Sequence, residues 1–261
     1  MSLHGRTALV TGSTSGIGLG VARALAAEGA RVTLNGFGDP AEIDALVAEI
    51  SASSGVPAAY DGADLSRGED VAAMVARAQE RAGSLDILVN NAGIQHVAPL
   101  DQFPPERWDA IIALNLSAVF HGMRAAIPGM RQRGYGRIIN IASAHGLVAS
   151  AQKVAYVAAK HGVVGATKVA ALETANDGIT VNAICPGWVL TPLVERQLAD
   201  RAAAAGTDVA TESALLLSEK QPMLSFTTPE AIGALALYLC SDAARTVTGA
   251  SVSIDGGWTA Q

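Results

Sequence analysis

The chain has 261 residues, of which 50% are hydrophobic and 27 are glycine; this suits a single α/β domain over residues 1–261 and excludes a disordered chain. Its formal net charge is −6 and its Lys and Arg residues are scattered, so nothing indicates a nucleic-acid partner. The two cysteines, Cys185 and Cys240, have neither metal-ligand spacing nor a disulfide pattern, so we expect no bound metal.

The first predicted element is a short buried strand over residues 6–11. It begins almost at the N-terminus, which leaves no room for a signal peptide. No apolar run in the sequence approaches the length of a membrane span. We therefore expect a cytoplasmic protein that has no membrane partner.

A glycine-rich turn, GSTSGIG at positions 12–18, follows this strand and leads into a helical run over 19–28. Glycines let a backbone approach a pyrophosphate closely, and a helix N-terminus supplies free N–H groups and the positive end of a dipole. The Gly-x-x-x-Gly-x-Gly spacing differs from the commonest dinucleotide fingerprint. Taken alone, the turn could also be an ordinary tight connection.

Strand-like and helix-like runs alternate along the rest of the chain. Further strands are predicted at 31–35, 57–60, 87–90, 137–142, 180–184 and 251–254, with helices at 71–81, 105–131 and 156–175. The runs at 87–89 and 138–141 are almost wholly apolar, as in strands that are covered on both faces. We predict a doubly wound, mostly parallel sheet of about seven strands with helices on both faces.

Residues 188–226 depart from this alternation. The segment is long, rich in alanine and predicted to be mostly helical. It follows a strand end, where doubly wound sheets bind their ligands. We predict that it forms a helical lid over a substrate site rather than a linker.

Tyr156 and Lys160 lie four positions apart on a predicted helix, so they share one face. A positive charge beside a phenol lowers its pKa from the usual value of about 10, which allows acid–base chemistry near neutral pH. An unrelated Tyr and Lys on a surface helix would give the same local pattern.

Six motifs occur in order along the chain: Thr11-Gly12-x-x-x-Gly16-x-Gly18, Asn90-Asn91-Ala92-Gly93, Asn115, Ser143, Tyr156-x-x-x-Lys160 and Pro186-Gly187. Their order and spacing resemble those of the short-chain dehydrogenase/reductase family, and the resemblance covers the whole chain. It implies a Rossmann-type fold and an oxidoreductase that uses a nicotinamide cofactor.

The same resemblance implies the residues that would bind the cofactor. They are Gly12, Thr14, Ser15, Gly16, Ile17, Gly18, Asn35, Phe37, Asp64, Leu65, Asn91, Ala92, Gly93, Tyr156, Lys160, Pro186, Gly187, Val189 and Thr191. Asn35 replaces the acid that usually meets the adenosine ribose of NAD. No Lys or Arg occurs at 13–15 or 35–38 to neutralise a 2′-phosphate, so we predict NAD rather than NADP.

By resemblance, the catalytic residues are Asn115, Ser143, Tyr156 and Lys160. Tyr156 would exchange a proton with the substrate oxygen, while Lys160 would lower the pKa of that tyrosine and hold the nicotinamide ribose. Ser143 would hydrogen-bond the reacting oxygen, and Asn115 would support a water relay to Lys160. Taken singly, Ser143 could be a helix cap and Asn115 a buried structural amide.

Polar residues gather around the predicted reaction centre. The expected substrate-binding residues are Gln95, Ser143, His145, Lys153, Tyr156, Trp188, Gln197 and Trp258. A Lys, a His and two amides suit a small carboxylate. The set resembles that of family members that interconvert D-3-hydroxybutyrate and acetoacetate, and we expect this reaction.

Two alternatives remain open at this point. A reductase of the same family could act on a sugar, a polyol or an acyl-carrier ketone, although an uncharged sugar would not require both Lys153 and His145. An NAD-binding sensor without turnover could keep the glycine-rich turn and discard the Tyr–Lys pair, which this chain retains.

The C-terminal stretch 247–258 resembles the last strand and tail of the family, a region that usually takes part in tetramers. The predicted helix 105–131 also carries more apolar positions than one sheet face needs. We therefore predict a homotetramer.

Overall fold

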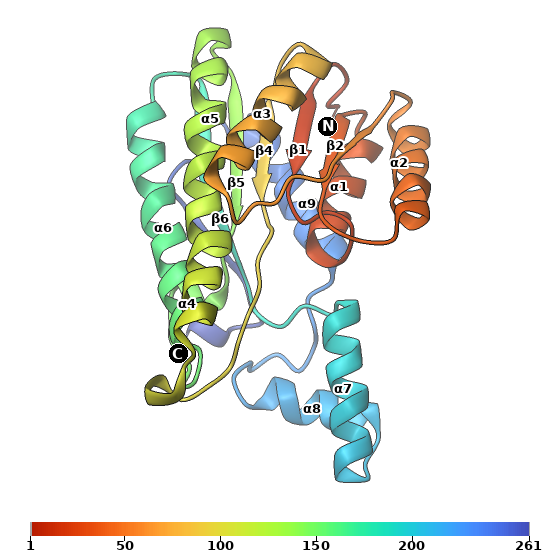
Figure 1. Cartoon of the computed structure of the whole chain (residues 1–261), viewed down its shortest axis with the longest axis vertical. Helices are drawn as coiled ribbons and strands as arrows, with labels where there is room; N and C mark the ends of the chain where they lie inside the picture. Colours follow the sequence, from red (N-terminus) through yellow and green to blue (C-terminus); the bar gives the residue numbers. More distant parts are fainter. Residues whose placement is uncertain (1, 261) are drawn as a thin grey trace.

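A seven-stranded parallel sheet forms the centre of the protein in the computed structural model, which describes residues 2–260 apart from the side chain of Leu193 (Figure 1). The strands are β1 (Thr7–Val10), β2 (Arg31–Asn35), β3 (Ala59–Asp61), β4 (Ile87–Asn90), β5 (Gly136–Ile141), β6 (Ile179–Pro186) and β7 (Ser251–Ile254). Their order is β3-β2-β1-β4-β5-β6-β7, and every pairing is parallel. This confirms the predicted doubly wound sheet and the approximate place of each predicted strand.

Helices cover both faces of the sheet. Helices α1 (Gly16–Ala27), α2 (Pro40–Ser54) and α9 (Pro229–Cys240) pack on one face, and α3 (Gly68–Ala82), α5 (Ala118–Arg133) and α6 (Val154–Thr174) pack on the other. Short 3₁₀ turns lie at Leu100–Gln102, Ala144–Gly146, Asp242–Ala244 and Trp258–Ala260.

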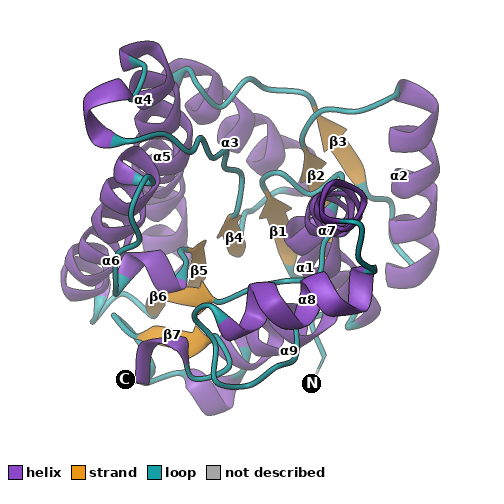
Figure 2. Cartoon of the chain, turned by 90° about the horizontal axis from the view of Figure 1, so that it is seen from below, coloured by secondary structure: helices purple, strands orange, loops and turns teal. Residues whose placement is uncertain are grey.

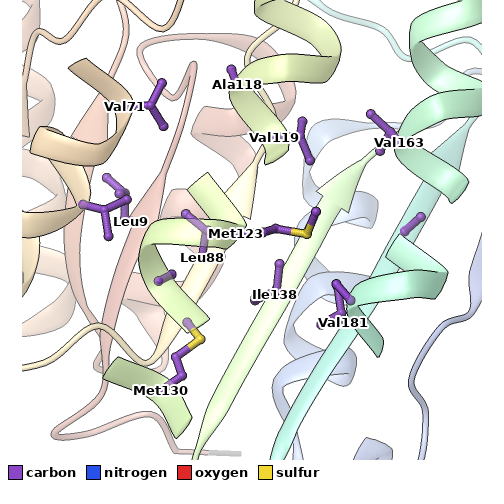
Figure 3. Close-up of a cluster of buried hydrophobic side chains, with 14 of the residues drawn as sticks. Leu9, Val71, Leu88, Ala118, Val119, Met123, Met130, Ile138, Val163 and Val181 are labelled. Carbon is purple, nitrogen blue, oxygen red and sulfur yellow. The ribbon is translucent and has the colours of Figure 1, made fainter. Parts of the chain in front are cut away.

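Each central strand supplies alternate side chains to the two cores, because successive residues of a strand point to opposite faces. Leu9, Leu88 and Ile138 face α3, α5 and α6 (Figure 3), whereas their neighbours Ile87 and Ile139 face α1 and α9. All five side chains are at most 1% exposed. Burial of each contributes about 1.5–3 kcal/mol, which explains why these runs read as continuously apolar.

The helix predicted over 105–131 is one helical stretch with an interruption. Helix α4 (Pro105–Ile112) passes through a π-helical turn, Ala113–Ser117, into α5. Contrary to the sequence-based expectation, the stretch Pro105–Arg133 is long and apolar enough to cross a membrane by length and composition alone. This is a weak indication, because a helix in a protein core passes the same test, and α5 contributes Val119, Met123 and Met130 to the core.

Helices α7 (Pro192–Ala205) and α8 (Val209–Ser218) project away from the sheet, beyond the end where the strands finish (Figures 1 and 2). They have a small core of their own, built from Val194, Leu198 and Leu216 with Trp188 and Phe226 packed against it. The predicted mostly helical character of residues 188–226 is therefore observed.

The segment that carries α7 and α8 is closed at its base by two backbone hydrogen bonds. The amide of Leu190 donates to the Thr227 carbonyl (2.9 Å), and the amide of Thr227 donates to the Trp188 carbonyl (3.0 Å). A third bond, from the Met223 amide to the Gly256 carbonyl (2.9 Å), joins the end of the segment to the C-terminal tail.

Candidate active site

A cleft of about 800 Å³ opens at the carboxyl ends of the parallel strands, between the sheet and α7. Three basic side chains line it: Lys153, Lys160 and Arg196. No Asp or Glu lines the cleft among residues 2–260. An anionic ligand is therefore favoured, because its charges would meet cations and no carboxylate.

The glycine-rich turn forms a cradle on one side of this cleft. Gly12 and Gly16 have φ values of 60° and 56°, which favour glycine. A side chain on Gly18 would collide with the Gly12 carbonyl. Helix α1 begins at Gly16, and the Ser15 side chain does not cap it, so its first N–H groups stay available to an anion. The cradle thus fits the pyrophosphate of a dinucleotide.

Asn91 braces this cradle. Its side-chain amide donates to the carbonyls of Thr11 (2.8 Å) and Gly12 (3.0 Å), and the Thr11 hydroxyl accepts from the amides of Asn91 (2.8 Å) and Ala92 (3.1 Å). The sequence-based prediction placed Asn91 among the cofactor-binding residues. Asn91 does line the cleft, but its amide is occupied in holding the turn in shape.

Asn35 is similarly occupied by the backbone. It is 1% exposed, its oxygen accepts from the Gly12 amide (3.3 Å), and its nitrogen donates to the Asp61 (2.9 Å) and Ala63 (3.2 Å) carbonyls. The residue that replaces the usual acid therefore connects the ends of β1, β2 and β3. It lines the cleft but offers no free amide group to a ribose.

Three further residues predicted to bind the cofactor, Phe37, Asp64 and Leu65, divide in the structure. Leu65 and the 72% exposed Phe37 line the cleft. Asp64 does not; its carboxylate accepts from the Ser66 amide (2.9 Å) and so supports a local turn. That backbone bond is the main cause of a lowered Asp64 pKa.

The structure brings Ser143, Tyr156 and Lys160 together at the wall of the cleft. Ser143 lies two residues after the end of β5, and the other two lie in the first two turns of α6. Buried Ala155 and Ala159 pack against Ile111, which turns the Tyr156–Lys160 face of α6 toward the cleft. This arrangement can transfer a proton to or from an oxygen held between Ser143 and Tyr156.

The predicted lowering of the Tyr156 pKa by Lys160 stays a prediction. Burial raises the pKa of Tyr156, and a hydrogen bond with Ser143 is the effect that lowers it. The Lys160 ammonium donates to the Ile141 carbonyl (2.7 Å) and lies 5.6 Å from the centre of the Tyr156 ring. Burial lowers the pKa of Lys160 itself to about 8.

Asn115 lies inside the π-helical turn and is fully buried. Its oxygen accepts from the Ile94 amide (2.9 Å), and its nitrogen donates to the Ile94 carbonyl (2.8 Å). Asn115 therefore fixes the loop that follows β4, close to Gly93, and does not line the cleft itself. Its predicted part in a water relay stays a prediction.

The predicted substrate end of the cleft is aromatic and basic. The His145 ring lies edge-on to Trp258 (5.0 Å between centroids) and to Tyr156 (5.9 Å), and Trp258 stacks on Trp188 (6.3 Å). The Lys153 ammonium lies 5.4 Å from the centre of the Trp188 ring. These residues and Gln95 all line the cleft.

Burial determines the protonation of this end of the cleft. It lowers the pKa of His145 to about 4, with a further contribution from the nearby Lys153 charge, so His145 is neutral at pH 7. Burial also lowers the pKa of Lys153. Lys153 forms no ion pair within residues 2–260, so its charge is available to a ligand.

Asp255 fixes Trp258 over the cleft. Its buried carboxylate accepts from the amides of Gly257 (3.1 Å) and Thr259 (3.0 Å) and from the Thr259 hydroxyl (2.6 Å). The C-terminal tail is thereby closed into a tight turn, with Trp258 only 7% exposed.

Two residues of α7 differ from the sequence-based expectation. Gln197 is exposed and does not line the cleft in this conformation, so its contact with substrate stays a prediction. Its neighbour Arg196 does line the cleft and was not predicted. The available signal was a cation within the expected lid of an anion-binding site, but the sequence alone could not show which side of α7 faces the cleft.

The chain is similar to known proteins over almost its whole length. A family model described as enoyl-(acyl carrier protein) reductase matches residues 12–259. The chain is 61% identical to D-beta-hydroxybutyrate dehydrogenase of Cupriavidus necator, over 99% of this chain and 100% of that protein. It is 53% identical to the D-beta-hydroxybutyrate dehydrogenase of Rhizobium meliloti, over 98% of this chain and 99% of that protein.

A solved structure extends the comparison to the fold. L-sorbose reductase from Gluconobacter frateurii, complexed with NADPH and L-sorbose, superposes with a TM-score of 0.95 at 30% identity. The match covers 100% of this chain and 99% of that one.

Proposed function

The chain belongs to the short-chain dehydrogenase/reductase family, and from this premise we propose that it interconverts D-3-hydroxybutyrate and acetoacetate with NAD as its cofactor. The observation that carries the proposal is Lys153, a partly buried cation that has no ion-pair partner in the described part of the chain and lines the same cleft as Ser143 and Tyr156. A substrate that carries a carboxylate near its reacting oxygen can place the carboxylate at Lys153 and the oxygen at Ser143 and Tyr156.

The relatives support this choice over its alternatives. Two bacterial proteins named for D-beta-hydroxybutyrate match almost the whole chain at 61% and 53% identity. The sugar reductase matches at 30% identity and supports the fold. A sensor without turnover would have no use for the assembled Ser143, Tyr156 and Lys160.

The proposed roles follow from the positions of the side chains. Lys153, together with His145 and Gln95, binds the carboxylate and aligns the reacting carbon, while Trp188 and Trp258 exclude water and larger groups. Ser143 donates a hydrogen bond to the reacting oxygen, and Tyr156 gives a proton to the ketone or takes one from the alcohol. A bound nicotinamide would accept or supply the hydride.

We propose that residues 188–226 act as a lid. The separate small core around Leu198, which α7 and α8 share, supports movement of these two helices as one unit. Closure would bring Gln197 from the exposed surface of α7 to the substrate carboxylate.

A cytoplasmic location is part of the proposal. It is supported by the two cysteines, Cys185 and Cys240, which are free and buried, as is usual in a reducing compartment.

The proposed reaction is tested by initial rates with NAD on both enantiomers of 3-hydroxybutyrate and on neutral secondary alcohols. We expect the D-enantiomer to have the highest kcat/KM of the panel. A neutral alcohol or a polyol that reacts as well as D-3-hydroxybutyrate would contradict the proposal.

We expect NAD to exceed NADP in kcat/KM by about tenfold or more, because an unpaired 2′-phosphate forgoes charge-assisted hydrogen bonds worth about 1.5–3 kcal/mol. The measurement is steady-state kinetics with each cofactor. Equal use of both cofactors would contradict the prediction, and Arg196→Ala would then show whether that arginine reaches the phosphate.

We also expect a homotetramer. Helices α5 and α6 carry exposed apolar side chains, namely Phe120 (51%), Val169 (55%) and Leu172 (81%), which suit a buried subunit interface. Light scattering at micromolar concentration should give about four times the chain mass of 26.5 kDa. A monomeric mass would rule the assembly out.

A further inference from the structure

A row of hydrogen-bonding groups leads from the reaction centre to Ser150, a residue that nothing above has assigned. Tyr156 and Ser143 line the cleft together, and interaction with Ser143 lowers the pKa of Tyr156. The Ser143 oxygen lies 3.4 Å from Nδ1 of His145, and Nε2 of the same ring lies 3.0 Å from the Ser150 oxygen. The two nitrogens of one buried imidazole therefore face two different hydroxyl groups.

The position of the single ring proton decides what His145 can do. A neutral imidazole has one N–H donor and one bare acceptor nitrogen. With the proton on Nδ1, the ring presents a donor on the side of Ser143. With the proton on Nε2, that side presents a lone pair, which repels a carboxylate and attracts the Ser143 hydroxyl proton away from the reacting oxygen.

We propose that Ser150 is a positioning residue whose hydroxyl donates to Nε2 of His145 and thereby holds the ring proton on Nδ1. The proposal rests on the proposed function, because a bare Nδ1 lone pair on that side would repel a carboxylate substrate. The Ser143 oxygen already accepts from the His145 amide (3.1 Å). A second donor at Nδ1 leaves the Ser143 proton free for the reacting oxygen.

The surroundings of Ser150 agree with this role. Within residues 2–260, the Ser150 hydroxyl has no partner other than His145. The ring of His145 is 4% exposed and held edge-on between Tyr156 and Trp258, so it cannot turn freely to exchange its nitrogens. Because the orientation of the His145 ring is already fixed, the hydrogen bond of the Ser150 hydroxyl decides whether the ring proton lies on Nδ1 or on Nε2.

The test combines nuclear magnetic resonance and kinetics on Ser150→Ala and Ser150→Thr. The protein is labelled with ¹⁵N-histidine and His145→Gln identifies the His145 resonances, since the chain has five histidines. In the wild type we expect ¹⁵N shifts of an Nδ1–H ring. Ser150→Ala should move them toward the Nε2–H form, and Ser150→Thr, which keeps the hydroxyl, should restore them.

Kinetic measurements test whether the position of the His145 ring proton affects substrate binding. Ser150→Ala should raise KM for D-3-hydroxybutyrate about three- to tenfold, as for the loss of one hydrogen bond, with the Kd of NADH unchanged. An Nε2–H ring in the wild type, or Ser150→Ala with unchanged shifts and KM, would overturn the inference. The resonance arm needs no substrate, so it decides the role of Ser150 even if 3-hydroxybutyrate is not turned over and the proposed function fails.

Discussion

Tyr156→Phe is expected to lower kcat by about a hundred- to ten-thousandfold, the range typical for loss of a general acid or base. The ring remains, so the packing against His145 is kept, while the transferable proton is lost. The Kd of NADH, measured by fluorescence titration, should stay within about twofold of the wild-type value because the glycine-rich cradle is untouched.

Tyr238→Phe is a matched control for this prediction. Tyr238 lies on α9 and is 47% exposed, away from the cleft wall. It should leave kcat unchanged. Substantial residual turnover in Tyr156→Phe would mean that another group carries the proton.

Lys153→Ala is expected to raise KM for D-3-hydroxybutyrate about ten- to hundredfold, with a smaller change in kcat. The substitution leaves the carboxylate beside aromatic walls without its cation, and a hydrogen bond to a charged group is worth about 1.5–3 kcal/mol. Lys168→Ala, at an exposed position of α6, is the matched control and should behave as wild type.

The pH dependence of KM should carry the same signature. Burial lowers the pKa of Lys153, so the cation that binds the carboxylate is present at neutral pH and is lost as pH rises through that lowered pKa. KM for the acid should therefore rise at a lower pH than an ordinary lysine would give. In Lys153→Ala this rise should disappear, and its persistence would assign the titration to another group.

Much of the fold could be predicted because the strands carry a strong local signal. Runs such as 87–89 and 138–141 are buried on both faces, so their apolar character is continuous and readable. The π-helical turn around Asn115 could not be read in this way, since one additional residue in a turn leaves no clear trace in an apolar pattern.

The sequence predicted which residues lie in the site better than it predicted what each side chain does there. The sequence placed Ser143, Tyr156 and Lys160 in one cleft, and the structure brings them together. The pKa of Tyr156 depends on burial, and the use of the Asn35 and Asn91 amides depends on backbone groups far away in sequence. The packing of Val194 and Leu198 in the small core sets the orientation of α7, which turns Arg196 and not Gln197 toward the cleft. The sequence alone does not show this orientation.

The central claim is that this cleft selects a carboxylate beside the reacting oxygen, and it is tested most directly by comparing D-3-hydroxybutyrate with its methyl ester in wild type and in Lys153→Ala. In the wild type, the acid should exceed the ester in kcat/KM by about tenfold or more, since the ester offers no charge to Lys153. In Lys153→Ala most of that preference should vanish. Equal kcat/KM for acid and ester in the wild type, unchanged by the substitution, would contradict the hydroxy-acid assignment.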